Sequence, residues 1–230
     1  KKKYIPLIIL LIAFSIYCSL IIGQSLDEEY YLFVGKNTLD YLLSLGNVNK
    51  DIAYGEYHST TYWSLLYLVT ELFPSKYTTE ITHLVSLLFS FAVIFGIGKV
   101  CTELFDKKVG KIIFIILFFY PIFFGHMSMN PSDTILAFGH VWISLLVLKY
   151  LRKQHWKDKS SINTYPLIIG VLAALSMGVQ IFFLASLAIV FLFILSKIFL
   201  FKKIIDKKFD RKKFFYDLLK SFIVFYFFLI

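Results

Sequence analysis

The sequence predicts an all-α fold: a polytopic transmembrane helix bundle of about seven spans, with interfacial helices in its first outer loop. Of the 230 residues, 58% are hydrophobic and only 17% are charged. The charged residues gather in a few short clusters that separate long apolar runs. Because soluble domains mix charged and apolar residues along every element, this segregation indicates that the folded chain lies in a bilayer.

The apolar runs give the order of the expected spans. They cover residues 5–23, 84–100, 112–125, 135–148, 167–195 and 222–230. A span needs roughly 20 helical residues, and the stretch 165–200 is long enough for two short spans that fold back near residues 177–180. We therefore expect a single transmembrane domain over residues 1–230, with seven helices of which the last is cut short.

The two chain ends favour the N-terminal part of a larger protein. The chain starts at Lys1 without a methionine and stops inside an apolar run at Ile230, so we expect further sequence after Ile230. A secretory signal peptide is the competing interpretation of residues 1–24, since it also has a basic start and an apolar middle. The length of the apolar run and the lack of a small-x-small cleavage site after it disfavour that interpretation.

The basic residues predict which helix ends face the cytoplasm. Of the 24 Lys and Arg residues, only Lys36, Lys50 and Lys76 fall in the long loop 24–79. The others gather at alternate helix ends, in residues 1–3, 99–111, 149–159 and 197–220. Because positive charge is retained in the cytoplasm during insertion, loops 24–79 and 125–133 should face outward. We expect a multi-pass protein of the plasma (inner) membrane whose functional site faces the non-cytoplasmic side.

The acidic residues show the opposite bias and favour the outer face as the place of any chemistry. Those in or beside the first outer loop are Asp27, Glu28, Glu29, Asp40, Asp51, Glu56, Glu71 and Glu80. The net charge of +9 does not indicate nucleic acid, because the basic clusters are explained by topology and by contacts to anionic lipid.

Asp27 and Glu28 follow the first expected span directly. The residues after them place apolar side chains at helical spacing, which predicts an interfacial helix that ends near Gly46. Both carboxylates should therefore lie at the mouth of any cavity between the spans. One reading is structural, because Ser25 and Glu28 have the spacing of a capping box. The other is catalytic, because a carboxylate at this place could take a proton from a hydroxyl that attacks a membrane-delivered donor.

Two further segments of the expected outer face carry polar side chains. Residues 54–63 are rich in aromatic and polar groups and precede an expected second interfacial helix at 64–73. Tyr62 and Trp63 are explained by the aromatic belt of the interface, whereas His58 could form a polar pocket with neighbouring tyrosines. Tyr54 lies in the same segment as His58 and is a candidate residue of the same site.

The second outer loop ends in Asn130-Pro131-Ser132-Asp133. Asn130 suits a helix cap, Pro131 suits the first helical position, and Asp133 can bond back to the cap. Capping does not explain His126, which is therefore a candidate binding residue.

Together these segments resemble the membrane GT-C glycosyltransferases. The residues that carry the resemblance are Leu26-Asp27-Glu28, Tyr54-Gly55, Gly125-His126 and Asn130-Pro131-Ser132-Asp133. The chain is similar to the N-terminal membrane half of the bacterial relatives of protein O-mannosyltransferases and the lipid A aminoarabinose transferase. The resemblance implies an inverting, mannosyltransferase-like enzyme that transfers a sugar from a polyprenyl-phosphate donor to a hydroxyl of a glycan, lipid or protein.

The resemblance also implies roles for individual residues. Asp27 would be the catalytic base or orient the acceptor, with Glu28 as its partner, and Asp133 would support the donor or acceptor pocket. Ser132 stands where many relatives carry Lys, so phosphate binding would fall to His126, His58, Lys36 or residues after Ile230. The resemblance to this group implies that the enzyme uses no metal and no cofactor.

A multi-span transporter and a non-catalytic membrane scaffold are the alternatives. A transporter would use polar residues near helix ends to line a path, but few charges lie within the expected spans and no inverted repeat is apparent. The chain has no Gly-x-x-x-x-Gly-Lys loop, and Gly96-Ile97-Gly98 is expected to be a packing motif inside a span. A lipid-linked donor is therefore favoured over a nucleotide sugar.

Overall fold

The computed structural model describes residues 5–47, 60–153, 164–199 and 210–229. Every regular element in these ranges is a helix, so the predicted all-α class is confirmed for this part of the chain. In chain order the elements are α1 (Ile5–Ile21), α2 (Leu26–Leu43), α3 (Thr61–Thr70), the 3-10 turn η2 (Ser75–Tyr77), α4 (Thr78–Leu104), α5 (Lys107–Phe119), α6 (Pro121–His126), α7 (Pro131–Lys153), α8 (Thr164–Met177), α9 (Phe183–Phe199) and α10 (Arg211–Leu229).

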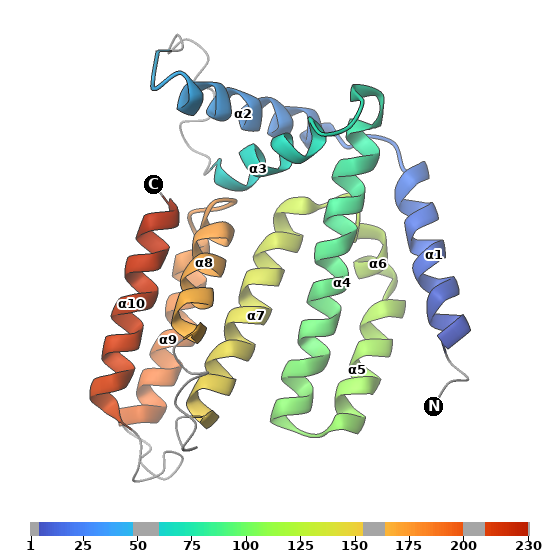
Figure 1. Cartoon of the computed structure of the whole chain (residues 1–230). Coiled ribbons are helices and arrows are strands. Elements are labelled where there is room, and N and C mark those ends of the chain that lie inside the picture. Colours follow the sequence, from blue (N-terminus) through green and yellow to red (C-terminus); the bar gives the residue numbers. More distant parts are fainter. Residues whose placement is uncertain (1–4, 48–59, 154–163, 200–209, 230) are drawn as a thin grey trace.

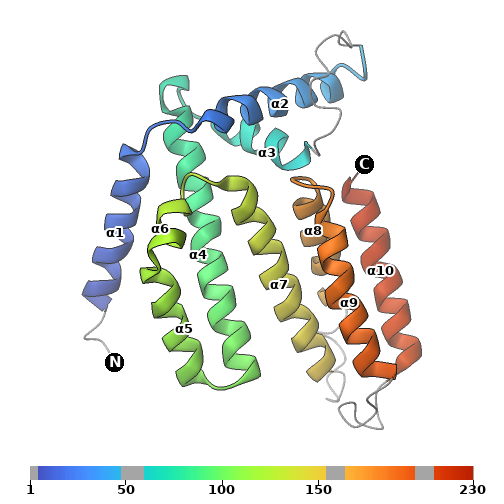
Figure 2. The same ribbon diagram turned by 180° about the vertical axis from the view of Figure 1, so that it is seen from behind.

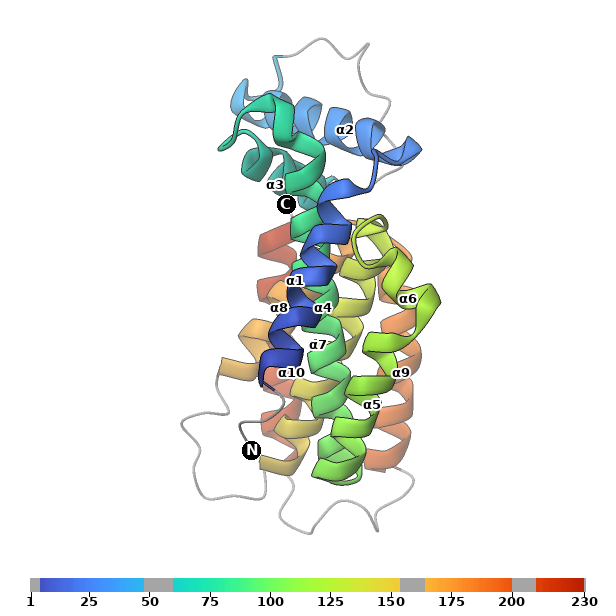
Figure 3. The same ribbon diagram turned by 90° about the vertical axis from the view of Figure 1, so that its right-hand side faces the viewer.

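The helices form a bundle that is covered at one end by α2 and α3. In Figure 1, α1, α4, α5 and α7 to α10 run in roughly the same direction, and α2 and α3 lie across their upper ends. The view from behind and the side view show the same arrangement (Figures 2 and 3). Apart from residues 112–125, each predicted span corresponds to one helix of the bundle, and the helices predicted after the first span lie over the end of the bundle.

Two helical stretches are long and apolar enough to cross a membrane, Ser75–Leu104 and Pro131–Leu151. Three further apolar helices are shorter, namely Pro6–Ile21, Thr164–Met177 and Phe183–Leu192. By length and composition the described residues thus contain two clear candidate spans, and the count of seven stays a prediction.

The prediction of one continuous helix over residues 112–125 is wrong. The chain ends α5 at Phe119 and starts the short helix α6 at Pro121. Proline has no backbone N–H and disfavours a helical conformation of the residue before it, here Tyr120, whose ψ of 114° is extended. This break turns α6 and His126 away from the direction of α5.

Helix α4 lies at the centre of the first half of the bundle and packs against α1, α5 and α7. Its two glycines allow these close approaches. A Cβ at Gly98 would lie 3.2 Å from the Gly110 carbonyl oxygen of α5, and one at Gly96 would meet Val141 and Trp142 of α7. The prediction that Gly96-Ile97-Gly98 is a packing motif is confirmed.

In the second half, α8 packs between α7 and α10. The Tyr150 hydroxyl of α7 donates a hydrogen bond of 2.8 Å to the buried Asp217 carboxylate of α10. α10 begins eleven residues before the apolar run that predicted it, because Lys212, Lys213 and Lys220 are accommodated in the helix. Lysine stems can pack along apolar surface while the ammonium reaches water.

Helices α2 and α3 cross closely and rest on the bundle. Gly35 of α2 sits against the Trp63 backbone carbonyl of α3, where a Cβ would clash. The Tyr62 N–H donates a hydrogen bond of 3.3 Å to the Gly178 carbonyl in the α8–α9 turn. As predicted, α2 ends before Gly46, where Leu45 and Gly46 have positive φ values of 54° and 85°.

Candidate functional site

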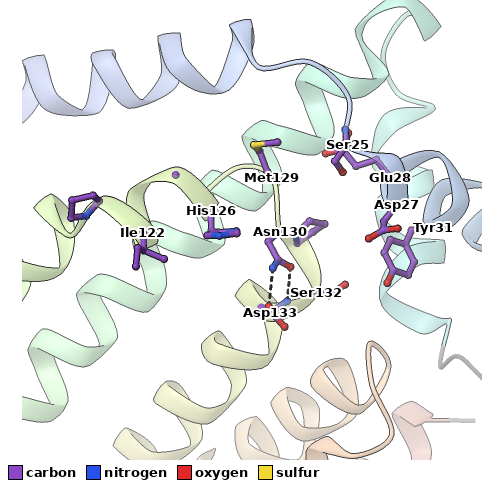
Figure 4. Close-up of a pocket in the computed structure, with 13 residues that line it drawn as sticks. Ser25, Asp27, Glu28, Tyr31, Ile122, His126, Met129, Asn130, Ser132 and Asp133 are labelled. Atoms are coloured by element: carbon purple, nitrogen blue, oxygen red, sulfur yellow. Dashed lines mark hydrogen bonds between the residues drawn. The ribbon is translucent and has the colours of Figure 1, made fainter.

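A pocket of about 670 Å³ opens between the start of α2 and the α6–α7 segment. One wall is formed by Ser25, Asp27, Glu28 and Tyr31. The other is formed by Pro121, Ile122, Gly125, His126, Met129 and the four residues from Asn130 to Asp133. Figure 4 shows the two walls facing each other. The two segments that the sequence predicted to be outer loops therefore meet at the same end of the bundle, and the volume is typical of a small-molecule site.

The first wall begins with the capping box predicted for Ser25 and Glu28, which the structure confirms. The Ser25 N–H donates a hydrogen bond of 3.1 Å to Glu28 Oε2. Three acidic residues occupy the first turn of α2, where the helix dipole stabilises negative charge. Glu28 points into the protein and is 2% exposed, whereas Asp27 is exposed and lines the pocket. The two neighbouring carboxylates thus lie in different surroundings.

The second wall ends in the predicted cap of α7. The Asn130 side-chain amide donates a hydrogen bond of 2.7 Å to Asp133 Oδ2, and the Asp133 N–H donates one of 3.2 Å to Asn130 Oδ1. These two bonds are drawn in Figure 4. His126 is the last residue of α6, is exposed and lines the same pocket. The His126 imidazole therefore shares one pocket with the Asp27 and Asp133 carboxylates.

Helix α4 holds both walls in place through three buried polar side chains. His83 Nε2 lies 2.6 Å from Glu28 Oε1, and His83 Nδ1 lies 3.1 Å from the Ser19 carbonyl oxygen of α1. The Ser86 and Ser90 hydroxyls donate hydrogen bonds of 3.2 Å and 2.8 Å to the Met127 carbonyl, directly after His126. Residues 83, 86 and 90 share one helix face because they are spaced three and four apart.

Aromatic side chains stand behind the first wall. The Tyr31 ring stacks on Trp63, with ring centroids 4.0 Å apart and an angle of 6° between the planes. Tyr62 and Trp63 are buried in a core cluster with Leu66, Ile135 and Val179. Burial raises the pKa of the Tyr62 hydroxyl above its ordinary value, so this group stays protonated. The aromatic-belt interpretation of Tyr62 and Trp63 does not fit, because both side chains pack inside the protein and do not face the headgroup region.

Five of the predicted site residues line the pocket, namely Asp27, Glu28, His126, Asn130 and Asp133. The predictions for Tyr54 and His58 lie outside the described residues. Lys36 does not line this pocket. Lys36 follows Asp27 by nine residues, which is two and a half helical turns, so it is exposed on the opposite face of α2.

Three contributions to the site were not predicted. Tyr31 lines the pocket one helical turn after Asp27, a spacing that could have identified it. His83 and the serine pair act from α4, and their signal in the sequence was a polar stripe along an apolar helix.

The described residues contain no group of three or more His, Cys, Asp or Glu side chains placed to bind one metal ion.

Comparisons of the chain with protein-family models, curated protein sequences and solved structures return no match.

Proposed function

We propose that the chain is the membrane part of a glycosyltransferase that moves a sugar from a polyprenyl-phosphate donor to a hydroxyl acceptor. The observation that carries this proposal is the pocket itself, which gathers Asp27, His126 and Asp133 from two segments about 100 residues apart at one end of an apolar helix bundle. The same residues carry the resemblance to GT-C glycosyltransferases. A lipid donor suits this place, because its tail can stay among the helices while its head enters the pocket.

In the proposed arrangement α1, α4, α5 and α7 to α10 span the plasma membrane. The α4–α5 turn, the end of α7 and the start of α10 lie at the end of the bundle opposite the pocket (Figure 1). The basic residues gather near these segments, which supports a cytoplasmic location for that end and a non-cytoplasmic location for the pocket. Helices α2 and α3 would then lie in the outer interface, where their aromatic and exposed apolar side chains suit the headgroup region.

The proposed reaction is a single displacement with inversion. The acceptor oxygen forms a bond to the anomeric carbon of the sugar while the bond from that carbon to the phosphate oxygen breaks. The polyprenyl phosphate leaves with the bonding electron pair, and Asp27 takes the proton of the attacking hydroxyl. Asp27 suits this role because it is exposed in the pocket and no described residue forms a hydrogen bond or ion pair with its carboxylate.

The second wall would bind the donor. The His126 imidazole can donate a hydrogen bond to the leaving phosphate, and it lies in the same pocket as Asp27. Asp133 and Asn130 hold each other through two hydrogen bonds, so the start of α7 forms a rigid edge of the pocket. Holding the donor and acceptor in a reactive orientation supplies much of the rate in such a displacement.

The test is Asp27→Asn in the full-length protein, with Asp40→Asn as the control. Asp40 is also exposed on α2 but does not line the pocket. With insertion and expression intact, Asp27→Asn should lower sugar transfer by about a hundredfold or more, because a general base contributes roughly 10²–10⁴-fold. Asp40→Asn should transfer like the wild type. Full activity of Asp27→Asn would remove this residue from the mechanism.

A further inference from the structure

His83 is fully buried and lies where α1, α2 and α4 meet. Both of its ring nitrogens face oxygen atoms: Nδ1 faces the Ser19 carbonyl at 3.1 Å, and Nε2 faces Glu28 Oε1 at 2.6 Å. Ser19 lies 64 positions before His83 and Glu28 lies 55 positions before it, so no local motif connects these residues. Their convergence places an imidazole directly behind the first wall of the pocket.

The protons of this group can be counted from the geometry. A carbonyl oxygen only accepts hydrogen bonds, so Nδ1 of His83 must carry a proton. One further proton then lies between Nε2 and Glu28 Oε1, either as an imidazolium–carboxylate pair or as an imidazole–carboxylic acid pair. The second carboxylate oxygen of Glu28 accepts the Ser25 N–H at 3.1 Å. Both oxygens of Glu28 are therefore engaged, and they are not presented to a substrate hydroxyl.

The position of Glu28 determines the direction of Asp27. Successive residues of an α-helix point about 100° apart. When His83 and the Ser25 N–H hold Glu28 toward α4, the first turn of α2 is fixed with Asp27 directed to the pocket. Ser86 and Ser90 hold Met127 from the same face of α4, so the opposite wall shares this anchor.

We infer that His83 is a positioning residue of the transfer site, which acts through Glu28 to fix Asp27, and that Glu28 is its structural partner and does not accept the substrate proton. This inference rests on the proposed function for its effect on catalysis. The contact between His83 and Glu28 itself can be measured without any substrate.

Two substitutions at His83 separate its two contacts. In His83→Gln the amide nitrogen can take the place of Nε2 and still donate to Glu28, while the contact to Ser19 is lost. In His83→Asn the amide nitrogen can take the place of Nδ1 and still donate to Ser19, while Glu28 loses its partner. The control is His140→Gln, because His140 contacts Ser186 between α7 and α9 and does not line the pocket.

The experiment compares purified full-length variants at equal amounts of monodisperse protein in proteoliposomes. His83→Asn should lower kcat about a hundredfold with the donor KM little changed, since misplacement of a reacting group by about 1 Å costs that much. His83→Gln should recover kcat to within about tenfold of the wild type, and His140→Gln should match the wild type. Equal kcat values for the Asn and Gln variants would overturn the inference, because the contact to Glu28 would then have no special effect.

An infrared measurement distinguishes failure of this inference from failure of the proposed function. The carboxyl band of Glu28 is assigned by its loss in Glu28→Gln. This band should shift further in His83→Asn than in His83→Gln, which keeps a donor to Glu28, and it should stay at its wild-type position in His140→Gln. If wild-type protein transfers no sugar but the band shifts as described, the proposed function fails and the contact stands. An unshifted band in His83→Asn would overturn the inference even in an active enzyme.

Discussion

Asp27 and Glu28 are neighbours in the sequence, yet their carboxylates lie in different surroundings. Asp27 is exposed in the pocket, whereas Glu28 is buried against His83 and caps its own helix. The position of both acids directly after an apolar run predicted that they lie at the mouth of a cavity, and both line the pocket. This difference in surroundings could not be predicted, because it depends on a histidine 55 residues away that a search for local motifs does not connect. That Lys36 lies outside the pocket could not be predicted from its charge, because charge alone does not say which helix face a residue occupies.

Tyr31 should contribute to the stability of the first wall. Replacing it with alanine removes the ring that stacks on Trp63, and we expect a loss of about 1–3 kcal/mol in the free energy of unfolding. Tyr31→Phe keeps the stack and should stay within about 0.5 kcal/mol of the wild type. Thermal unfolding in detergent, followed by Trp fluorescence, measures both. Equal melting temperatures of Tyr31→Ala and the wild type would show that the stack does not stabilise the wall.

At the scale of elements, local rules predicted the helix ends better than the helix lengths. The cap at Asn130 and the capping box at Ser25 were both predicted from residues within four positions of each other. The break at Pro121 was missed because the surrounding residues are uniformly apolar, so hydropathy did not separate α5 from α6. Nor could periodicity show that α2 and α3 touch at Gly35, since their contact involves residues 28 positions apart.

The close crossing of α2 and α3 predicts that an alanine at Gly35 destabilises the protein, the opposite of the usual effect of this substitution in a helix. Glycine to alanine within a helix normally stabilises by about 0.5–1 kcal/mol, but a Cβ at Gly35 would clash with the Trp63 carbonyl. We therefore expect Gly35→Ala to destabilise the protein by about 1–3 kcal/mol, because α2 and α3 must separate. Thermal unfolding in detergent measures this loss.

The matched control for this substitution is Gly125→Ala. Gly125 is also helical, and a Cβ at this position would meet nothing within 4 Å. Gly125→Ala should leave the free energy of unfolding unchanged or raise it slightly. If Gly35→Ala were as stable as Gly125→Ala, the close crossing of α2 and α3 would be wrong.

For the whole molecule, the sequence predicted that two segments far apart along the chain lie at the same end of the bundle. The structure brings them together around one pocket. This prediction depended on the order of the apolar runs and on the positions of the lysines. Both patterns extend along the whole sequence, so they do not depend on any single residue. The shape of the pocket could not be predicted, because it follows from the turn at α6 and from the anchoring of both walls on α4.

The orientation in the membrane can be measured with single cysteines. After Cys18 and Cys101 are replaced by alanine, a cysteine is placed at Asn47, beyond the end of α2, or at Phe105, in the α4–α5 turn; both positions are exposed. A membrane-impermeant maleimide should label Asn47→Cys in intact cells and Phe105→Cys only after permeabilisation. Labelling of both from the same side would rule out the proposed placement of the bundle.

The most direct test of the sugar-transfer proposal is an assay of the full-length protein in proteoliposomes with radiolabelled polyprenyl-phosphate sugars and a lipid extract as the source of acceptor. The proposed function predicts that the label leaves the polyprenyl phosphate and appears on a hydroxyl-bearing product, and that this transfer depends on Asp27. If the label stays on the polyprenyl phosphate with every donor, or moves across the bilayer while still attached to its carrier, the chain does not belong to a sugar-transferring enzyme.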